Sequence, residues 1–234
     1  MPFSNRTEAG RELAKALAFY KEQHPVILAL PRGGAPVAAE IAAALEAPLD
    51  LVLVRKIGVP FQPELAMGAI GEGGVRVENA DVLRSTGLDE ADLAAAEVRE
   101  RPEVERRASR YRHGEPRLPL DGRCALIVDD GIATGSTVRA ACQVARRLGA
   151  ARLVVAVPVA SRLATEELRD VCDELISLAV PDPFFAVGEW YRDFSQTTDQ
   201  EVADALRPQR SDPGAIGDGR SERPCESTGT GDAG

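Results

Sequence analysis

The 234-residue chain lacks the features that mark several common protein classes. Its four cysteines are scattered, without a C-x-x-C pair, so the sequence predicts neither a zinc site nor a disulfide framework. No apolar run approaches the roughly 18 residues of a membrane span, and residues 1–20 lack the apolar core of a signal peptide. The formal net charge is -9 at pH 7, which argues against non-specific binding of nucleic acid or anionic membrane. We therefore expect a soluble protein of the reducing cytoplasm, with neither of those partners.

The chain does contain a regular alternation of short apolar runs and helical patterns. Hydrophobic residues make up 44% of it, enough for one good-sized α/β domain. Continuous apolar runs are typical of strands buried on both faces, and strand, loop, helix and strand within about thirty residues form a parallel βαβ unit. The predicted fold class is therefore α/β, a parallel sheet flanked by helices. The expected strands cover residues 25–30, 49–54, 124–129, 152–159 and 173–180, and the expected helices cover 4–23, 35–47, 135–149, 161–171 and 197–207.

Residues 55–120 interrupt this alternation. The stretch 67–83 has the pattern of a hairpin that turns at residues 72–74. Residues 88–116 have a heavily charged helical pattern with Pro102 inside it. Because a long polar excursion between core strands is usually functional or mobile, we predict one domain over residues 1–207 with a helical insertion at about 60–120. From residue 208 the composition changes to Gly, Ser, Asp, Pro and Thr, which predicts a disordered tail over 208–234.

The segment LIVDDGIATGST, residues 126–137, is the most informative motif. An apolar strand ends in Asp129 and Asp130, and a loop of small and hydroxyl residues leads into a helix. The N–H groups and dipole at a helix start favour a phosphate, and the two carboxylates can accept hydrogen bonds from sugar hydroxyls. An ordinary strand–turn–helix junction, with Asp130 as a helix cap, is the alternative. A Walker loop needs a lysine after the second glycine, and none follows Gly135.

Two further strand ends carry phosphate-binding chemistry. In PRGG, residues 31–34, the glycines permit a tight turn that presents N–H groups, and Arg32 adds a planar donor fork. A plain β–α turn is the alternative. In RKIG, Arg55 and Lys56 follow the strand predicted at 49–54, and solvated surface charge is the alternative. Ligands gather at the carboxyl ends of parallel strands, so these loops are expected to lie together.

These motifs, in this order and spacing, resemble those of the type I phosphoribosyltransferases, over residues 5–206. The resemblance implies a small hood over the active site, from residues of about 1–24 and 180–206. It also implies 5-phosphoribosyl 1-diphosphate (PRPP) with Mg²⁺ as the donor, and the carboxylates Asp129 and Asp130 as the catalytic pair. The implied 5-phosphate ligands are Ala133, Thr134, Gly135, Ser136 and Thr137, and the implied diphosphate ligands are Arg32, Gly33, Gly34 and Lys56.

The acceptor is the open part of this interpretation. Five of the ten aromatic residues lie at 184–194, and Phe184 or Phe185 is the candidate to stack on a base, with core packing as the alternative. The insertion yields no assignable catalytic Arg or Lys, and Mg²⁺ is expected to arrive on the diphosphate rather than at a protein-built site. The resemblance predicts transfer of the phosphoribosyl group to a nitrogen acceptor such as a nucleobase, by a possible homodimer. The alternatives are a regulator that binds PRPP or a nucleotide without transfer, and hydrolysis or transfer on another phosphorylated substrate.

Overall fold

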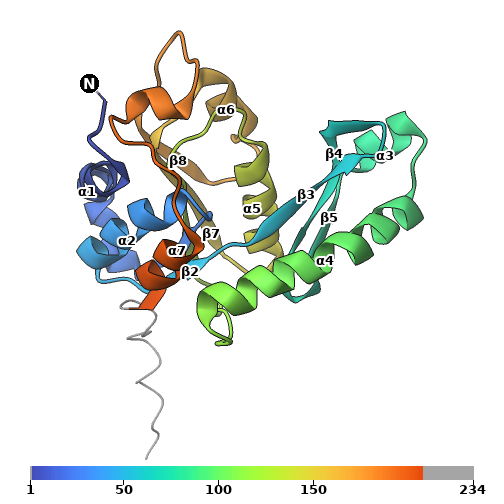
Figure 1. Cartoon of the computed structure of the whole chain (residues 1–234), viewed down its shortest axis with the longest axis horizontal. Helices are drawn as coiled ribbons and strands as arrows, with labels where there is room; N and C mark the ends of the chain where they lie inside the picture. Colours follow the sequence, from blue (N-terminus) through green and yellow to red (C-terminus); the bar gives the residue numbers. More distant parts are fainter. Residues whose placement is uncertain (1, 208–234) are drawn as a thin grey trace, which may run out of the picture.

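The computed structural model describes residues 2–207, so the tail predicted for residues 208–234 lies outside the described part of the chain. These residues form a layered core and an arm that extends from it (Figure 1). The core holds a five-stranded sheet in the order β2-β1-β6-β7-β8, in which each strand pairs in parallel with its neighbour. The predicted α/β class with a parallel sheet is therefore confirmed. The core strands are β1 (Val26–Ala29), β2 (Leu49–Leu51), β6 (Cys124–Val128), β7 (Arg152–Val159) and β8 (Glu174–Ala179).

Helices cover both faces of this sheet because successive strand residues point to opposite sides. In β6, Leu126 and Val128 pack with the helices α1, α2 and α7, whereas Ala125 and Ile127 pack with α5 and α6. Strands buried in this way read as unbroken apolar runs, which is why the sequence revealed them. The helices of the core are α1 (Arg6–Ala16), α2 (Gly34–Leu45), α5 (Ser136–Arg147), α6 (Arg162–Glu167) and α7 (Asp199–Leu206), with the short 3-10 segments η1 (Ala18–Gln23) and η3 (Val187–Trp190).

Three of the core helices begin at caps that the sequence shows. The Asn5 side chain accepts from the N–H of Glu8 and so starts α1, as the capping pattern predicts. The Ser161 hydroxyl caps α6, and Thr198 forms a capping box with Glu201 at the start of α7. These caps fix where the chain enters each helix, and two of them border the candidate site.

The arm is built from the predicted insertion and the strand residues just before it. It contains an antiparallel sheet of β3 (Val54–Val59), β4 (Gln62–Gly71) and β5 (Arg76–Glu78), with the predicted turn present as η2 (Glu72–Gly74). Helix α3 (Ala80–Thr86) lies at the far end, and α4 (Glu90–Arg112) runs from there back to α7, with Pro102 inside it (Figure 1). Within residues 2–207, no helix combines the length and apolarity needed to cross a membrane.

A buried ionic cluster joins the arm to the core. The guanidinium of Arg112, at the end of α4, donates from Nε to Asp50 Oδ1 at 2.6 Å and from Nη2 to the Leu51 carbonyl at 3.0 Å. It also contacts both carboxylate oxygens of Glu72 in η2. The Arg112 and Asp50 side chains are only 2% and 1% exposed, respectively. One side chain thus connects the long helix, the edge strand β2 and the hairpin turn.

Candidate functional site

The two predicted phosphate loops follow the neighbouring strands β1 and β6, at the point where the strand order of the sheet reverses direction. Strands β1 and β6 are neighbours, but the chain leaves β1 toward β2 and leaves β6 toward β7. In open parallel sheets the carboxyl ends of two such strands border a ligand crevice. The PRGG loop follows β1 and the DDGIATGST loop follows β6, so the structure brings together the two motifs that the sequence placed 98 positions apart (Arg32 to Asp130).

Close packing between these loops explains the paired glycines. The Leu30 N–H donates to the Val128 carbonyl at 2.8 Å. A Cβ at Gly33 would lie 2.1 Å from Asp130 Oδ2, and a Cβ at Gly34 would lie 2.5 Å from the Val128 carbonyl oxygen. Any side chain at either position would therefore displace the DDGIATGST loop. The glycines let the PRGG backbone lie directly against the carboxylate of Asp130.

The loop at residues 131–137 has the form of an anion cradle. Gly135, with φ of +76°, turns the chain into α5, a conformation that a side chain would disfavour. Ser161 holds the loop in place through two hydrogen bonds. Its N–H donates to the Ile132 carbonyl at 2.8 Å, and its hydroxyl donates to the Ala133 carbonyl. In the described part of the chain no side chain caps α5, so its first N–H groups face the loop. The exposed Thr134 and Thr137 and the half-buried Ser136 add hydroxyl donors.

The carboxylates of Asp129 and Asp130 lie in a partly buried setting that disfavours charge. Burial, followed by the neighbouring charge of Asp130, raises the pKa of Asp129 well above its ordinary value. Burial also raises the pKa of Asp130, although the hydrogen bond and charge of Arg6 act in the opposite direction. The Asp130 N–H donates to Asp129 Oδ1 at 2.9 Å, which holds the pair in a fixed arrangement. A ligand that supplies hydroxyl donors or positive charge would therefore stabilise the ionised form of both carboxylates.

Arg6 is a site residue that sequence reasoning missed. Its Nε donates to Asp130 Oδ2 at 2.7 Å, and its Nη1 donates to the Ser195 carbonyl at 2.7 Å. The guanidinium carbon lies 4.1 Å from the centre of the Phe194 ring, within cation–π range, and the Arg6 side chain is only 11% exposed. The Tyr191 hydroxyl donates to the Asp130 carbonyl at 2.6 Å. No motif distinguishes Arg6 from other helix arginines, because its partner lies 124 residues away.

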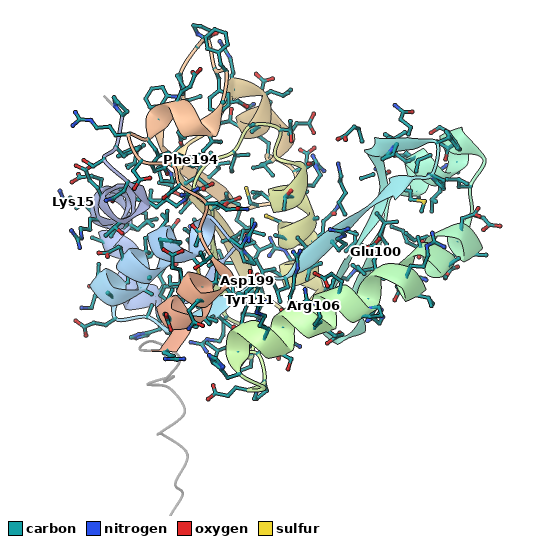
Figure 2. The ribbon with its side chains drawn as sticks, viewed as in Figure 1. Lys15, Glu100, Arg106, Tyr111, Phe194 and Asp199 are labelled. Carbon is teal, nitrogen blue, oxygen red and sulfur yellow. The ribbon has the colours of Figure 1, made fainter. Side chains whose placement is uncertain are left out.

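Of the two segments predicted as a hood, residues 3–4 and 190–193 are joined to each other, whereas α1 and α7 of the same segments pack in the core. The Phe3 N–H donates to the Trp190 carbonyl at 2.7 Å, and the Asp193 N–H donates to the Ser4 carbonyl at 3.0 Å. Val187 packs so closely on Gly131 that a Cβ there would lie 2.5 Å from Val187 Cγ1. The N-terminal and C-terminal segments thus form one cover over the DDGIATGST loop. Figure 2 labels Phe194, which belongs to this cover.

The candidates for base stacking differ in exposure. Phe185 is 75% exposed, so it is not part of the packed core, whereas Phe184 is partly buried. Both precede Val187 in the loop that leads into η3. They stay predictions, since proximity to the crevice is shown only for Val187.

Lys56 does not lie where the sequence predicted. The strand predicted at 49–54 ends at Leu51 in the core, and Arg55 and Lys56 belong to β3 of the arm. Their placement at the carboxyl end of a core strand is therefore wrong, because the chain leaves the core sheet three residues earlier. With Ser136 and Arg139, Lys56 instead lines a hollow of about 310 Å³ between the arm and α5. The Lys56 ammonium donates to the Glu64 carbonyl of the arm at 3.3 Å, and Arg55 pairs with Glu100 of α4 at 2.8 Å.

Arg32 extends away from the PRGG backbone and is 41% exposed, with Nη1 3.8 Å from Asp199 Oδ1 at the start of α7. Within residues 2–207 no three His, Cys, Asp or Glu side chains gather to hold a metal ion. The site therefore offers backbone N–H groups, hydroxyls, one exposed guanidinium and a fixed pair of carboxylates. That donor set is suited to a phosphorylated sugar.

Comparisons with known proteins agree with this geometry. The profile described as "Phosphoribosyl transferase domain" matches residues 4–193. The chain is 56% identical over 200 residues to two Mycobacterium tuberculosis proteins, from strains CDC 1551 and H37Rv, each named as a supposed phosphoribosyl transferase. The match covers 86% of this chain and 45% of each relative, so the chain spans about half the length of these curated relatives. The crystal structure of TT1426 from Thermus thermophilus is similar with a TM-score of 0.84 and 44% identity, over 90% of this chain and 100% of that one.

Proposed function

The chain belongs to the phosphoribosyl transferase domain family, and on that premise we propose that it moves the 5-phosphoribosyl group from PRPP to a nitrogen acceptor, releasing magnesium-diphosphate. One observation carries the proposal. The PRGG and DDGIATGST loops lie against each other at the carboxyl ends of β1 and β6, with Gly33 packed directly against the carboxylate of Asp130. Groups suited to diphosphate, ribose and 5-phosphate are thereby adjacent, as a single PRPP molecule requires.

Each loop has one role in holding the donor. The N–H groups at the start of α5, with the hydroxyls of Thr134, Ser136 and Thr137, hold the 5-phosphate. The carboxylates of Asp129 and Asp130 accept hydrogen bonds from the two ribose hydroxyls. The backbone of Gly33 and Gly34 and the fork of Arg32 hold the diphosphate. Lys56 reaches the same donor from the arm side.

The reaction forms a bond from the acceptor nitrogen to ribose C1 and breaks the bond from C1 to the diphosphate oxygen, with inversion at C1. Positive charge develops on the ribose ring as the leaving group departs. Asp129 and Asp130 are fixed beside that ring, and their negative charge stabilises the transition state electrostatically. Burial makes this interaction stronger than it would be in water.

Magnesium is part of the donor in this proposal. The oxygen atoms of the two carboxylates and of the diphosphate are the hard ligands that Mg²⁺ prefers. When bound, the ion neutralises charge on the leaving diphosphate. In this proposal the protein residues would orient the complex of Mg²⁺ with the diphosphate.

The acceptor is proposed to enter beside the hood. Phe185, and to a lesser extent Phe184, offers an exposed aromatic face in the loop that leads to Val187. A flat heteroaromatic base is the acceptor class that such a ring would stack on. We therefore propose a nucleobase as the acceptor class.

The test is diphosphate release from PRPP and Mg²⁺ in the presence of a panel of purine, pyrimidine and amine acceptors. The proposal predicts release with at least one acceptor, together with the matching nucleotide product. PRPP binding without release for any acceptor would support the regulator instead. Phosphate release from substrates unrelated to PRPP would point to hydrolysis and contradict both.

A further inference from the structure

A single carboxylate at the edge of the crevice is shared by residues from three distant segments. Asp199, the first residue of α7, has Oδ2 2.8 Å from Arg110 Nη1 and Oδ1 3.8 Å from Arg32 Nη1. The Tyr111 hydroxyl donates to the same Oδ1 at 2.8 Å. Arg32 belongs to the PRGG loop, and Arg110 and Tyr111 belong to the end of α4. We call Arg32, Arg110, Tyr111 and Asp199 the Asp199 cluster; Figure 2 shows Tyr111 and Asp199 side by side where α4 meets α7.

The cluster places two guanidinium groups around one anion. The two oxygens of a carboxylate are adjacent, so the forks of Arg32 and Arg110 converge on the same spot. Both arginines keep access to solvent, with side chains 41% and 56% exposed, and Asp199 is 26% exposed. Tyr111 is buried, and burial raises its pKa, so it acts there as a neutral donor. The spot is accessible to a dissolved anion, and it lies beside the loop proposed to hold diphosphate.

Other arginines of α4 are arranged differently. Arg106 and Arg107 both donate to the carboxylate of Glu103 on their own helix, at distances of 2.7 to 2.9 Å. Both are thus paired with a carboxylate of their own helix. Arg110 instead pairs with Asp199 of α7, and Arg112 pairs with the buried Asp50 and Glu72. Of the two, Arg110 is the exposed one, and the carboxylate that it contacts also lies near Arg32.

We propose that Arg110 is a further diphosphate-binding residue and that Asp199 occupies, in the ligand-free protein, the anion position that the diphosphate takes. Carboxylate and phosphate oxygens are interchangeable partners for an arginine fork. A diphosphate carries more charge and more acceptor oxygens than Asp199, so it can bridge Arg32 and Arg110 in its place. The inference rests on the proposed function and adds the insertion's contribution to the donor site.

The test compares two probes of different parts of the site by calorimetry on the full chain. Magnesium-diphosphate reports on the Asp199 cluster, whereas ribose 5-phosphate reports on the α5 loop. We expect Arg110→Gln to weaken diphosphate binding about tenfold, the loss of one charge-assisted contact, with ribose 5-phosphate unchanged. Arg110→Lys, which keeps the charge without the fork, should recover part of the loss. Asp199→Asn should tighten diphosphate binding, because it removes the competing anion and keeps an acceptor for Tyr111.

Arg84→Gln is the control, since Arg84 lies in α3 at the far end of the arm, is 72% exposed and pairs with Asp81 of its own helix. We expect it to change either affinity less than about twofold. The inference would be overturned if the control substitution weakened diphosphate binding as much as Arg110→Gln does. It would also be overturned if Arg110→Gln weakened the binding of diphosphate and of ribose 5-phosphate equally. Weaker diphosphate binding in Asp199→Asn would also overturn it. A wild-type protein that binds neither probe would instead refute the proposed function, and with it this inference.

Discussion

At the residue scale, the adjacent carboxylates of Asp129 and Asp130 are costly to the fold and useful to the site. Burial disfavours the charged form of both carboxylates, and Arg6 offsets this through its charge at Asp129 and through a hydrogen bond and its charge at Asp130. Such an arrangement is retained where function requires it. Replacing a carboxylate should therefore stabilise the fold while it weakens donor binding.

The substitution Asp129→Asn tests the cost to stability. In the folded protein burial and Asp130 raise the pKa of Asp129 above its unfolded value of about 3.9. The folded state then binds the proton more tightly, so wild-type stability falls as pH rises from the unfolded pKa to the folded pKa. Asparagine has no such proton. The advantage of the variant should grow through this range and reach about 1–2 kcal/mol at neutral pH, as measured by thermal unfolding at several pH values.

An Asp129→Asn variant that is less stable than the wild type at neutral pH, or an advantage that shrinks as pH rises, would contradict this account. Glu12→Gln is a suitable control, since Glu12 pairs only with Lys15 of the same helix at the surface. Its effect on stability should be small, because the pair is exposed at the surface.

The substitution Arg6→Gln tests how the second carboxylate is kept ionised. The groups that face Asp130 are Arg6 from α1, Asp129 beside it and Tyr191 from the hood. Arg6 is the one cation among them and the largest influence that favours the charged form, so its loss should raise the pKa of Asp130 further. PRPP affinity should fall about tenfold at neutral pH. The pH below which PRPP binding weakens should also be higher in the variant than in the wild type. Arg11→Gln, on the exposed side of the same helix, should leave both unchanged.

At the element scale, α4 is attached to the core at its C-terminal end by Arg112. Removing this side chain leaves Asp50 and Glu72 buried without their main partner. Breaking a buried ion pair in this way costs about 3–5 kcal/mol. We expect Arg112→Met to lower the free energy of unfolding by that amount in urea titrations, and the exposed Arg106→Gln to change it by less than about 0.5 kcal/mol. A loss below about 1 kcal/mol for Arg112→Met would show that the arm is held by its apolar contacts instead.

The elements that the sequence predicted best are those with strong local signals. The core strands are continuous apolar runs, and the structure has helices within the ranges expected at 4–23, 161–171 and 197–207, each with a side-chain cap at its start. The sequence does not reveal the break between β2 and β3, because the apolar run Leu51–Val54 crosses it without a turn residue. Only the tertiary structure shows that the chain leaves the core sheet after Leu51 and pairs Val54 with Gly71. Lys56 was misplaced for the same reason.

At the scale of the whole molecule, the parallel topology assembles the site from loops with recognisable motifs. Loop contacts such as that of Gly33 with Asp130 follow from strand neighbours and could be expected from the sequence. Arg6 and Asp199 could not, because each lies in a segment with no motif and contacts a motif residue more than a hundred positions away in the sequence. In the proposed function the hood forms the acceptor side of the site. There the local sequence does not distinguish an aromatic side chain that stacks on a base from one that packs in the core.

The measurement that tests the central claim most directly is a calorimetric titration of the protein with PRPP and Mg²⁺, beside an Asp129→Asn, Asp130→Asn double variant. The account predicts binding with a dissociation constant in about the micromolar range, lost in a variant that is folded and at least as stable. Absence of binding to a demonstrably folded wild type would contradict it, because the crevice at the ends of β1 and β6 would then be only a strand–turn–helix junction. Undiminished binding by the double variant would equally contradict the role assigned to the two carboxylates.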